Sequence, residues 1–277
     1  MKITVVIVVY KIKLSSSKTI QSLNRVIDNN SVLMKDLSII IYDNSPEKQD
    51  VPSQYEHLKI FYKHDSRNIG IVTAYNSAFQ IAKDTGSEWL LLLDHDTELT
   101  EDYVRQIGNL GNFDNSVVTV VPKINYESIM ISPVFSDSFR PLKGEKPQPG
   151  LQNSPVMAIN SGALIRVSFL TEINGFNPQF PLDYLDHWLF YEIYARGYKV
   201  WVLETTIQHE LSVMDYSGIS IVRYRSILDS EITFYKKYKK DLLPSYRMQL
   251  AKRLLKQMLL VKNKKIAAYT LRRILSL

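Results

Sequence analysis

Long apolar runs in the first third of the sequence constrain the fold more than any other feature. They cover residues 3–10 (ITVVIVVY), 37–42 (LSIIIY) and 89–93 (WLLLL), and none alternates strictly with polar residues. A strand of this kind is covered on both faces, as strands are in a parallel sheet. The pattern therefore predicts an α/β fold with a mostly parallel central sheet.

The segments between and after these runs fit the same scheme. The expected elements are a helix from Ser17 to about Asp28, a strand over 59–63, a helix over 70–83, a helix capped by Thr100, a strand over 117–121, a helix over 184–196 and a strand over 199–203. Residues 123–155 lack periodicity and contain several prolines, which predicts a long loop. Strands that alternate with helices predict βαβ units, whose ligands bind beyond the carboxyl ends of the strands.

Length and composition exclude several classes of protein. The 277 residues suffice for one main domain with an appendage, and 45% hydrophobic with 22% charged residues excludes wholesale disorder. The chain has no cysteine, which excludes disulfides and thiolate metal sites and favours a reducing compartment. No apolar run reaches the roughly 18 residues that a membrane-spanning helix needs, so we expect a soluble or peripheral protein.

Acidic residues end the third apolar run, in Asp94-His95-Asp96. Two carboxylates two residues apart on a regular strand point to the same side, and each raises the other's pKa unless a cation intervenes. Hard oxygen ligands suit Mg²⁺ or Mn²⁺, whose coordination shell is often completed by water and phosphate. The alternative is that both are exposed loop residues. Tyr10 and Asp43 follow two other strands and are predicted to reach the same crevice.

The segment LLLLDHDTEL resembles the Asp-Xaa-Asp motif of family 2 glycosyltransferases, and LDHDT is most similar to the rhamnosyltransferase-like branch of that family. Further landmarks stand in the family's order over residues 3–211: VVIVVY, IIIYDNS, NIG followed by Asn, NSGALI, LDYLDHWLFYEIYARGYKV and IQHEL. The resemblance implies a GT-A (nucleotide-diphospho-sugar transferase) fold over residues 1–218, with helices around a mostly parallel sheet. Residues 219–277 would form a basic, amphipathic helical appendage.

The resemblance also implies a site for a nucleotide-sugar donor. Asp43 would contact the pyrimidine base or the ribose, with Tyr10 at the base-binding edge, although Asp43 could instead only shape a turn. Asn68 and Gly70 are similar to the donor-site turn of the family, where glycine permits close backbone approach. Asn160, in NSGALI, would belong to the same donor site.

A metal site is implied next to the donor. Asp94 would meet the ribose or the metal shell, and Asp96 would bind Mn²⁺ or Mg²⁺ directly, so that the metal holds the diphosphate. His209, in IQHEL, would lie near the metal, where a neutral imidazole can ligate Mn²⁺. Without the resemblance, a lone histidine reads as a structural residue.

Asp186 matches the general base of the family at the start of a helix, and Asp183 is the reserve candidate. Taken without the family, Asp183 would cap this helix and Asp186 would sit favourably near the positive end of its dipole. The implied reaction is a single inverting displacement by an acceptor hydroxyl. Departures at Lys11 and Tyr75 leave the sugar open between L-rhamnose from dTDP-rhamnose, our first expectation, and a hexose from a UDP-sugar. The acceptor would be a glycan or lipid-linked saccharide in cell-surface polysaccharide synthesis.

Basic charge is concentrated at the end of the chain. Residues 223–277 contain 15 Lys and Arg against 3 Asp and Glu, although the whole chain has a net charge of only +6. Leu250, Leu254, Met258 and Val261 recur there at helical spacing. The segment would either pack on the core as a terminal helix or bind an anionic membrane surface. We therefore expect a cytoplasmic protein, peripheral on the inner face of the membrane, and no nucleic-acid partner, because no reader motif accompanies the charge.

Two other functions are compatible with an acidic α/β site. A sugar-nucleotide nucleotidyltransferase would need a glycine-rich, basic loop after the first strand, and YKIKLSSSK has no glycine. A catalytically inactive GT-A-like module could serve only to bind a membrane or a partner. Loss of Asp94, Asp96 or Asp186 would favour that interpretation, and the chain has all three.

Overall fold

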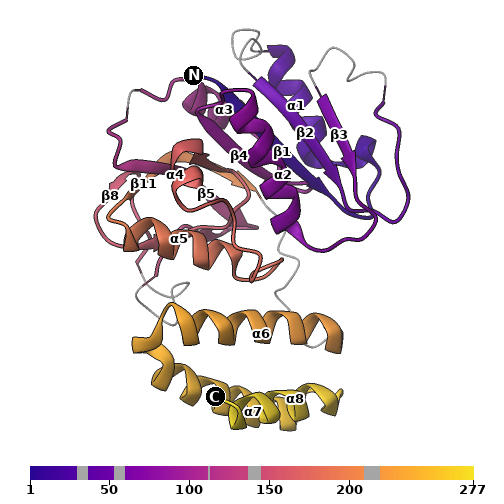
Figure 1. Ribbon diagram of the computed structural model, residues 1–277, viewed down its shortest axis with the longest axis vertical. Helices are drawn as coiled ribbons and strands as arrows, with labels where there is room; N and C mark the ends of the chain where they lie inside the picture. The colour runs from indigo at the N-terminus through magenta and orange to yellow at the C-terminus, as the bar shows by residue number, and fades with distance from the viewer. Residues whose placement is uncertain (30–36, 53–59, 112, 137–144, 209–218) are drawn as a thin grey trace.

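The computed structural model describes residues 1–29, 37–52, 60–111, 113–136, 145–208 and 219–277. A central sheet has the strand order β3-β2-β1-β4-β10-β5-β11-β8, with β6 paired to β5 (Figure 1). Four strands at one side of this sheet are all parallel: β1 (Ile3–Val9), β2 (Leu37–Asp43), β3 (Ile60–His64) and β4 (Trp89–Asp94). β1, β2 and β4 correspond to the three apolar runs in the sequence, and β3 corresponds to the strand expected over 59–63.

The other side of the sheet mixes strand directions. Its strands are β5 (Val117–Tyr126), β6 (Ile129–Ser132), β8 (Gly150–Gln152), β10 (Ala163–Arg166) and β11 (Lys199–Gln208). β10 is antiparallel to both β4 and β5, whereas β11 is parallel to β5. A separate two-stranded sheet pairs β7 (Val134–Phe135) with β9 (Val156–Met157).

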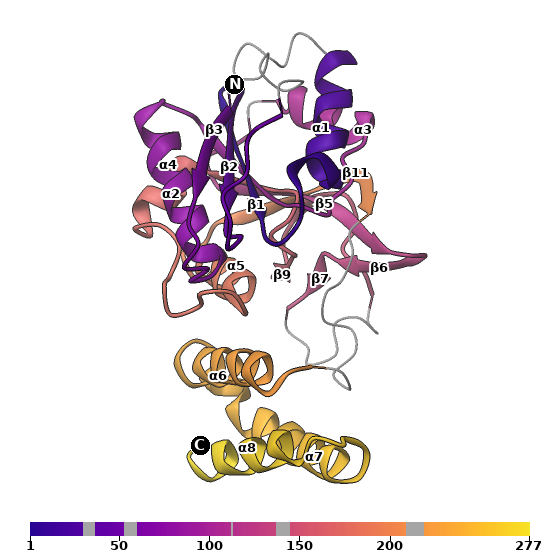
Figure 2. The ribbon, with the colours of Figure 1, turned by 90° about the vertical axis from the view of Figure 1, so that its right-hand side faces the viewer.

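Helices cover both faces of the sheet (Figure 2). One face packs against α2 (Ile71–Asp84), α4 (Val167–Glu172) and α5 (Leu185–Ala195), and the other against α1 (Lys18–Asn29) and α3 (Glu101–Gly108). Short 3-10 turns are η1 (Leu14–Ser16) and η5 (Lys240–Leu242). Because strands and helices form these layers, the predicted α/β class with a mostly parallel sheet flanked by helices is confirmed.

Three C-terminal helices lie below the sheet in Figure 1: α6 (Ile221–Lys237), α7 (Leu243–Leu260) and α8 (Lys264–Leu275). They share an apolar cluster of their own around Tyr224, Leu228 and Leu250. Phe234 of α6 belongs instead to the main core, so α6 connects the two layers. The predicted boundary at residue 218 falls in 209–218, outside the described residues, and the division into two domains stays a prediction.

The two predicted helix caps, Ser17 and Thr100, agree with the structure, but the predicted long loop does not. Ser17 Oγ accepts a hydrogen bond from Ile20 N (3.2 Å), and Thr100 Oγ1 accepts one from Tyr103 N (3.1 Å). The loop expected over 123–155 is wrong, because β5 continues to Tyr126 and forms a hairpin with β6, while β7 and β8 also lie in that range. Strand pairing overrides the irregular sequence pattern there.

Candidate active site

Polar residues gather where three parallel strands end. In the pairing register, Val9 lies opposite Asp43 and Val8 lies opposite Asp94, so the two carboxylates flank the end of β1. Tyr10 follows immediately, with 39% of its surface exposed, and Lys11 Nζ lies 5.1 Å from its ring centre. The ring therefore offers an accessible face at the edge of this crevice.

The acidic pair sits on a turn and not on a regular strand. β4 ends at Asp94, and the chain turns at His95 and Asp96. The strand alternation that would point both carboxylates to the same side does not apply to this pair, because β4 ends at Asp94, two residues before Asp96. Both side chains are half-buried at this turn.

Hydroxyl groups from the start of α1 hold the backbone of this turn. Ser17 Oγ donates to the carbonyl of His95 (2.8 Å), and Thr19 Oγ1 donates to the carbonyls of Asp94 and Thr97. The Thr19 hydroxyl also accepts from Thr97 N (2.9 Å). The sequence alone did not identify Thr19 as part of the candidate site, because threonine at this position is an ordinary helix residue. These contacts fix the turn before any ligand binds.

The NSGALI segment supports the same turn from the other side. Ser161 Oγ accepts a hydrogen bond from Asp94 N (2.9 Å) and lies 2.5 Å from Thr97 Oγ1. Its neighbour Asn160 is 6% exposed, and the side-chain oxygen of Asn160 has no hydrogen-bond partner among the described residues. A buried oxygen without a partner is costly, so it is a natural place for a donor group or a cation.

Asp43 is fully buried and its carboxylate already has several donors. One oxygen accepts from Ser45 N (2.8 Å), and the other accepts from Tyr62 Oη (2.8 Å) and Gln49 Nε2 (3.0 Å). Burial together with the Asp43 carboxylate raises the pKa of Tyr62 to about 12. Asp43 thus shapes the turn after β2, and its contact with a base stays a prediction.

Asn68 and Gly70 form a tight approach to the segment before α5. Asn68 (φ 45°) and Gly70 (φ 105°) both have positive φ, and a Cβ on Gly70 would lie 2.1 Å from the carbonyl oxygen of Pro181. That carbonyl accepts a hydrogen bond from Val72 N (3.2 Å) at the start of α2. Glycine is therefore required at position 70 in this structure because its backbone lies close to the carbonyl group of Pro181.

Replacing Gly70 by alanine should strongly destabilise the fold. Positive φ alone should lower the free energy of unfolding of the alanine variant by ~1 kcal/mol. The added methyl group also clashes with backbone atoms, which should lower it by about 1–3 kcal/mol more. Gly150→Ala is a matched control, because Gly150 has nearly the same φ (106°) but open space around it. Urea denaturation of both variants measures the difference, and equal free energies of unfolding would contradict the close approach at Pro181.

Asp186 lies in the first turn of α5, where its Oδ1 accepts a hydrogen bond from His187 N (2.8 Å). Asp183 does not cap this helix, contrary to expectation. Tyr184 occupies the N-cap position with a left-handed backbone, and no side chain caps it. Asp183 turns toward α6, where its Oδ2 accepts from Arg223 and Ser226. Burial raises the pKa of Asp183 and Arg223 opposes this shift.

Tyr75 connects the two acidic parts of the site. Its ring is fully buried on α2, and its hydroxyl has no hydrogen-bond partner among the described residues. Burial raises the pKa of Tyr75, and the negative charges of Asp94 and Asp186 raise it further. Both carboxylates therefore lie within electrostatic range of one hydroxyl. The sequence showed Tyr75 only as a departure from the family pattern.

The oxygen atoms at the end of β4 suit a hard divalent cation. The described residues include no group of three His, Asp or Glu side chains that could hold a metal by themselves. Mg²⁺ commonly takes only one or two carboxylates and completes its shell with water and phosphate oxygens. Asp94, Asp96 and the amide oxygen of Asn160 are oxygen ligands of this kind, and they would hold such a cation if a phosphate-bearing ligand completed its shell. His209 lies outside the described residues.

Solved structures with the same fold include one that is named as a mannosyltransferase. The mannosyltransferase PcManGT from Pyrobaculum calidifontis, in complex with GDP-Man and Mn²⁺, has a TM-score of 0.59 and 15% identity, covering 99% of this chain and 75% of its own. S. aureus TarS 1-349 has a TM-score of 0.56 and 12% identity, covering 100% and 88%. The complex of S. aureus TarS 1-349 with UDP-GlcNAc has a TM-score of 0.55 and 14% identity. The match covers 100% of this chain and 89% of that chain. At these identities the likeness establishes the GT-A fold.

The family of this chain is identified from its sequence. No curated protein matches the chain. The family described as "Glycosyl transferase family 2" matches residues 4–173, which is more than half of the chain and includes the acidic turn after β4. Together with the GT-A fold, this match shows that the chain belongs to glycosyl transferase family 2 and is a glycosyltransferase.

Proposed function

We propose that this glycosyltransferase is a metal-dependent, inverting enzyme that moves a sugar from a nucleotide donor to a hydroxyl of a glycan or lipid-linked saccharide in cell-surface polysaccharide synthesis. The observation that carries the proposal is the family match over residues 4–173, which includes the acidic turn after β4. Asp186 lies beyond the matched range, in the first turn of α5, and we propose that it faces the donor held at that acidic turn.

Asp186 would act as the general base. Its carboxylate takes the proton from the acceptor hydroxyl as that oxygen forms a bond to the anomeric carbon. The bond from the anomeric carbon to the diphosphate breaks, and the nucleoside diphosphate leaves with the electron pair. The hydrogen bond from His187 N holds the Asp186 carboxylate in place at the start of α5. A cation held by Asp94 and Asp96 would supply Lewis-acid stabilisation of the leaving diphosphate.

The donor we propose first is dTDP-rhamnose, followed by a UDP-hexose. The LDHDT sequence supports rhamnose, and the exposed ring of Tyr10 supports stacking with a base. The neighbours were solved with UDP-GlcNAc and GDP-Man, which supports a nucleotide sugar in this cleft without fixing the base or the sugar.

Release of nucleoside diphosphate from a panel of donors tests the proposal. The full chain is incubated with dTDP-rhamnose, UDP-glucose, UDP-galactose, UDP-GlcNAc or GDP-mannose, with and without Mn²⁺. We expect release from dTDP-rhamnose or a UDP-hexose, and only with metal. Release without metal would contradict the metal dependence. No release from any donor would favour the inactive binding module.

A membrane-binding face on α7 and α8 would bring the enzyme to lipid-linked acceptors. Residues 243–277 contain nine Lys and Arg and no Asp or Glu. Large apolar side chains are exposed on the same helices, namely Met248, Leu255, Met258, Leu259, Leu260, Leu271 and Leu275. Apolar and basic side chains together are the features of a helix that lies in the interface of an anionic bilayer. In the described ranges, no helix is long and apolar enough to cross a membrane.

Vesicle co-sedimentation tests this face. Leu259 and Leu260 are 81% and 68% exposed, so replacing both by serine should leave the fold intact. We expect the wild-type chain to bind phosphatidylglycerol vesicles, to bind phosphatidylcholine vesicles weakly, and to dissociate in high salt. The double variant should bind at least about tenfold more weakly. Equal binding of both proteins, or oligomers formed through this face without vesicle binding, would contradict the proposal.

A further inference from the structure

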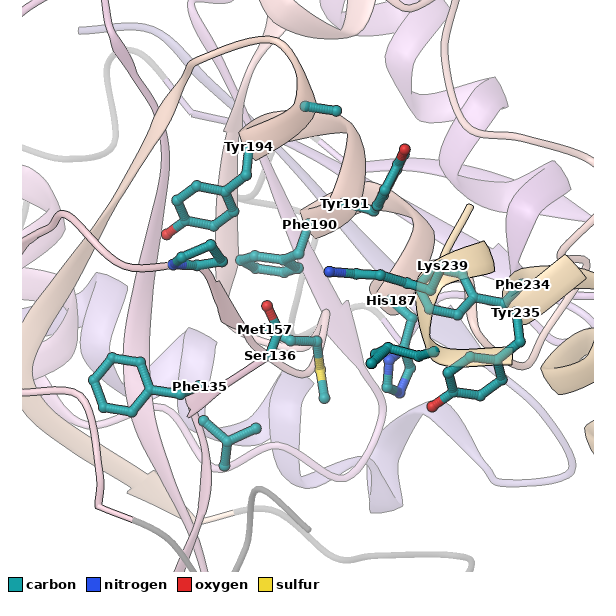
Figure 3. Close-up of a pocket in the computed structure, with 14 residues that line it drawn as sticks. Phe135, Ser136, Met157, His187, Phe190, Tyr191, Tyr194, Phe234, Tyr235 and Lys239 are labelled. Atoms are coloured by element: carbon teal, nitrogen blue, oxygen red, sulfur yellow. The ribbon is translucent and has the colours of Figure 1, made fainter. Parts of the chain in front are cut away.

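A cavity of about 310 Å³ lies between α5, α6 and the β7–β9 pair (Figure 3). Five of its lining residues come from α5: His187 and, three, four, seven and eight positions later, Phe190, Tyr191, Tyr194 and Ala195. This spacing places them on one face of the helix. The face begins one residue after Asp186, which lies on the same turn of α5 but does not itself line the cavity.

Residues from α6 and the segment after it close the cavity. Phe234 and Tyr235 add two more aromatic rings, and Lys239 extends its side chain among them (Figure 3). The Lys239 ammonium lies 5.9 Å from the ring centre of Tyr191. Phe234 lies 5.6 Å from the ring of His187 and 6.3 Å from that of Tyr191. α6 and the segment after it therefore complete a wall that α5 and the β7–β9 pair leave open.

We propose that this aromatic cavity binds a sugar ring of the acceptor next to Asp186, an inference that rests on the proposed transferase function. A pyranose has one face of C–H groups, which packs on aromatic rings, and a rim of hydroxyls, which need hydrogen-bond partners. The lining provides both, because flat rings alternate with the polar groups of His187, Ser136 and Lys239. The ammonium also suits an acceptor that carries a negative group near this ring.

The size and chemistry of the cavity argue against other occupants. Its volume is at the lower end of the roughly 300–1,000 Å³ of small-molecule pockets, which suits one or two sugar rings and not a long lipid chain. An acyl or polyprenyl chain would leave the half-buried imidazole of His187 and the hydroxyl of Ser136 without partners, which is costly. The lipid part of a lipid-linked acceptor would instead extend outward, away from this cavity.

Tyr191 allows a sharp test, because it is half-buried and its ring lines the cavity without contact with the acidic turn. Tyr191→Leu keeps an apolar side chain but removes the flat ring, and Tyr191→Phe keeps the ring. Tyr198→Leu is a control for loss of a tyrosine outside the cavity. The probes are methyl α-L-rhamnopyranoside, methyl β-D-glucopyranoside and methyl β-D-galactopyranoside at millimolar concentration, observed by saturation-transfer NMR on the full chain.

We expect at least one methyl glycoside to receive magnetisation on its C–H face from the wild-type chain, from Tyr191→Phe and from Tyr198→Leu. Tyr191→Leu should bind it about tenfold more weakly. The inference is overturned if no glycoside binds the folded wild-type chain, if Tyr191→Leu binds as well as wild type, or if farnesyl phosphate displaces the glycoside and binds more tightly. Donor turnover is measured separately in each variant. Intact metal-dependent donor hydrolysis with no glycoside binding would reject the cavity alone, whereas no hydrolysis of any donor would reject the proposed function.

Discussion

Replacing Asp186 by asparagine is expected to lower kcat for sugar transfer by about 10²–10⁴-fold and to leave donor binding unchanged. Asparagine has nearly the same shape and can still accept the hydrogen bond from His187 N, but it cannot take a proton from the acceptor hydroxyl. The helix start therefore keeps its geometry while the proposed base is lost. Steady-state kinetics together with calorimetry of nucleotide binding separate the two effects.

Asp183→Asn is the matched control for this variant. Asp183 accepts from Arg223 and Ser226, and its loss weakens the connection between the loop before α5 and the helix α6. We expect it to lower the free energy of unfolding, because Arg223 loses its charged partner, with a smaller effect on kcat than Asp186→Asn. Unchanged turnover in Asp186→Asn with a large loss in Asp183→Asn would move the base to Asp183.

Replacing Asp96 by alanine should abolish both activity and the dependence of nucleotide binding on metal. Asp94 and Asp96 are the two carboxylates that we propose hold the cation at the turn after β4. Removing one of them should leave too few hard ligands to hold the cation beside a diphosphate. Calorimetric titration of UDP or dTDP, with and without Mn²⁺, measures the effect directly.

Asp102→Ala provides the corresponding control. Asp102 lies in the first turn of α3 and pairs with Arg105 on the surface, so the variant removes one negative charge from the same neighbourhood without touching the turn after β4. It should bind nucleotide and metal as the wild-type chain does. If Asp96→Ala retains metal-enhanced nucleotide binding, the cation must be held elsewhere.

The strands and helices around β1 could be predicted because their sequences are locally unambiguous. The runs that form β1, β2 and β4 are apolar on both faces, and Thr100 is a strong capping residue. The continuation of β5 past residue 121 and its hairpin with β6 could not be predicted, because residues 122–132 are partly polar, β6 has only four residues, and β5 depends on pairing with distant residues such as those of β11. Their pairing partners become apparent only in the folded sheet.

The sequence predicted the carboxylates of the candidate site, whose roles stay predictions. It did not predict the residues that hold the backbone around them. Asp94 and Asp186 carry the family pattern, but the hydroxyls of Thr19 and Ser161 act through backbone contacts with residues about 70 positions away, which no local pattern reveals. Asp183 has the composition of a helix cap, yet Arg223 from α6 draws it away. A tertiary ion pair thus replaced a local capping preference.

The central claim is that a divalent cation on the acidic turn after β4 connects the protein to the diphosphate of a nucleotide sugar. Anomalous diffraction from a crystal soaked with Mn²⁺ and UDP or dTDP tests it most directly. We predict a manganese peak bonded to a carboxylate oxygen of Asp96 and to the diphosphate. A bound nucleotide with no manganese at that turn, or with Asp94 and Asp96 directed away from the diphosphate, would contradict the claim.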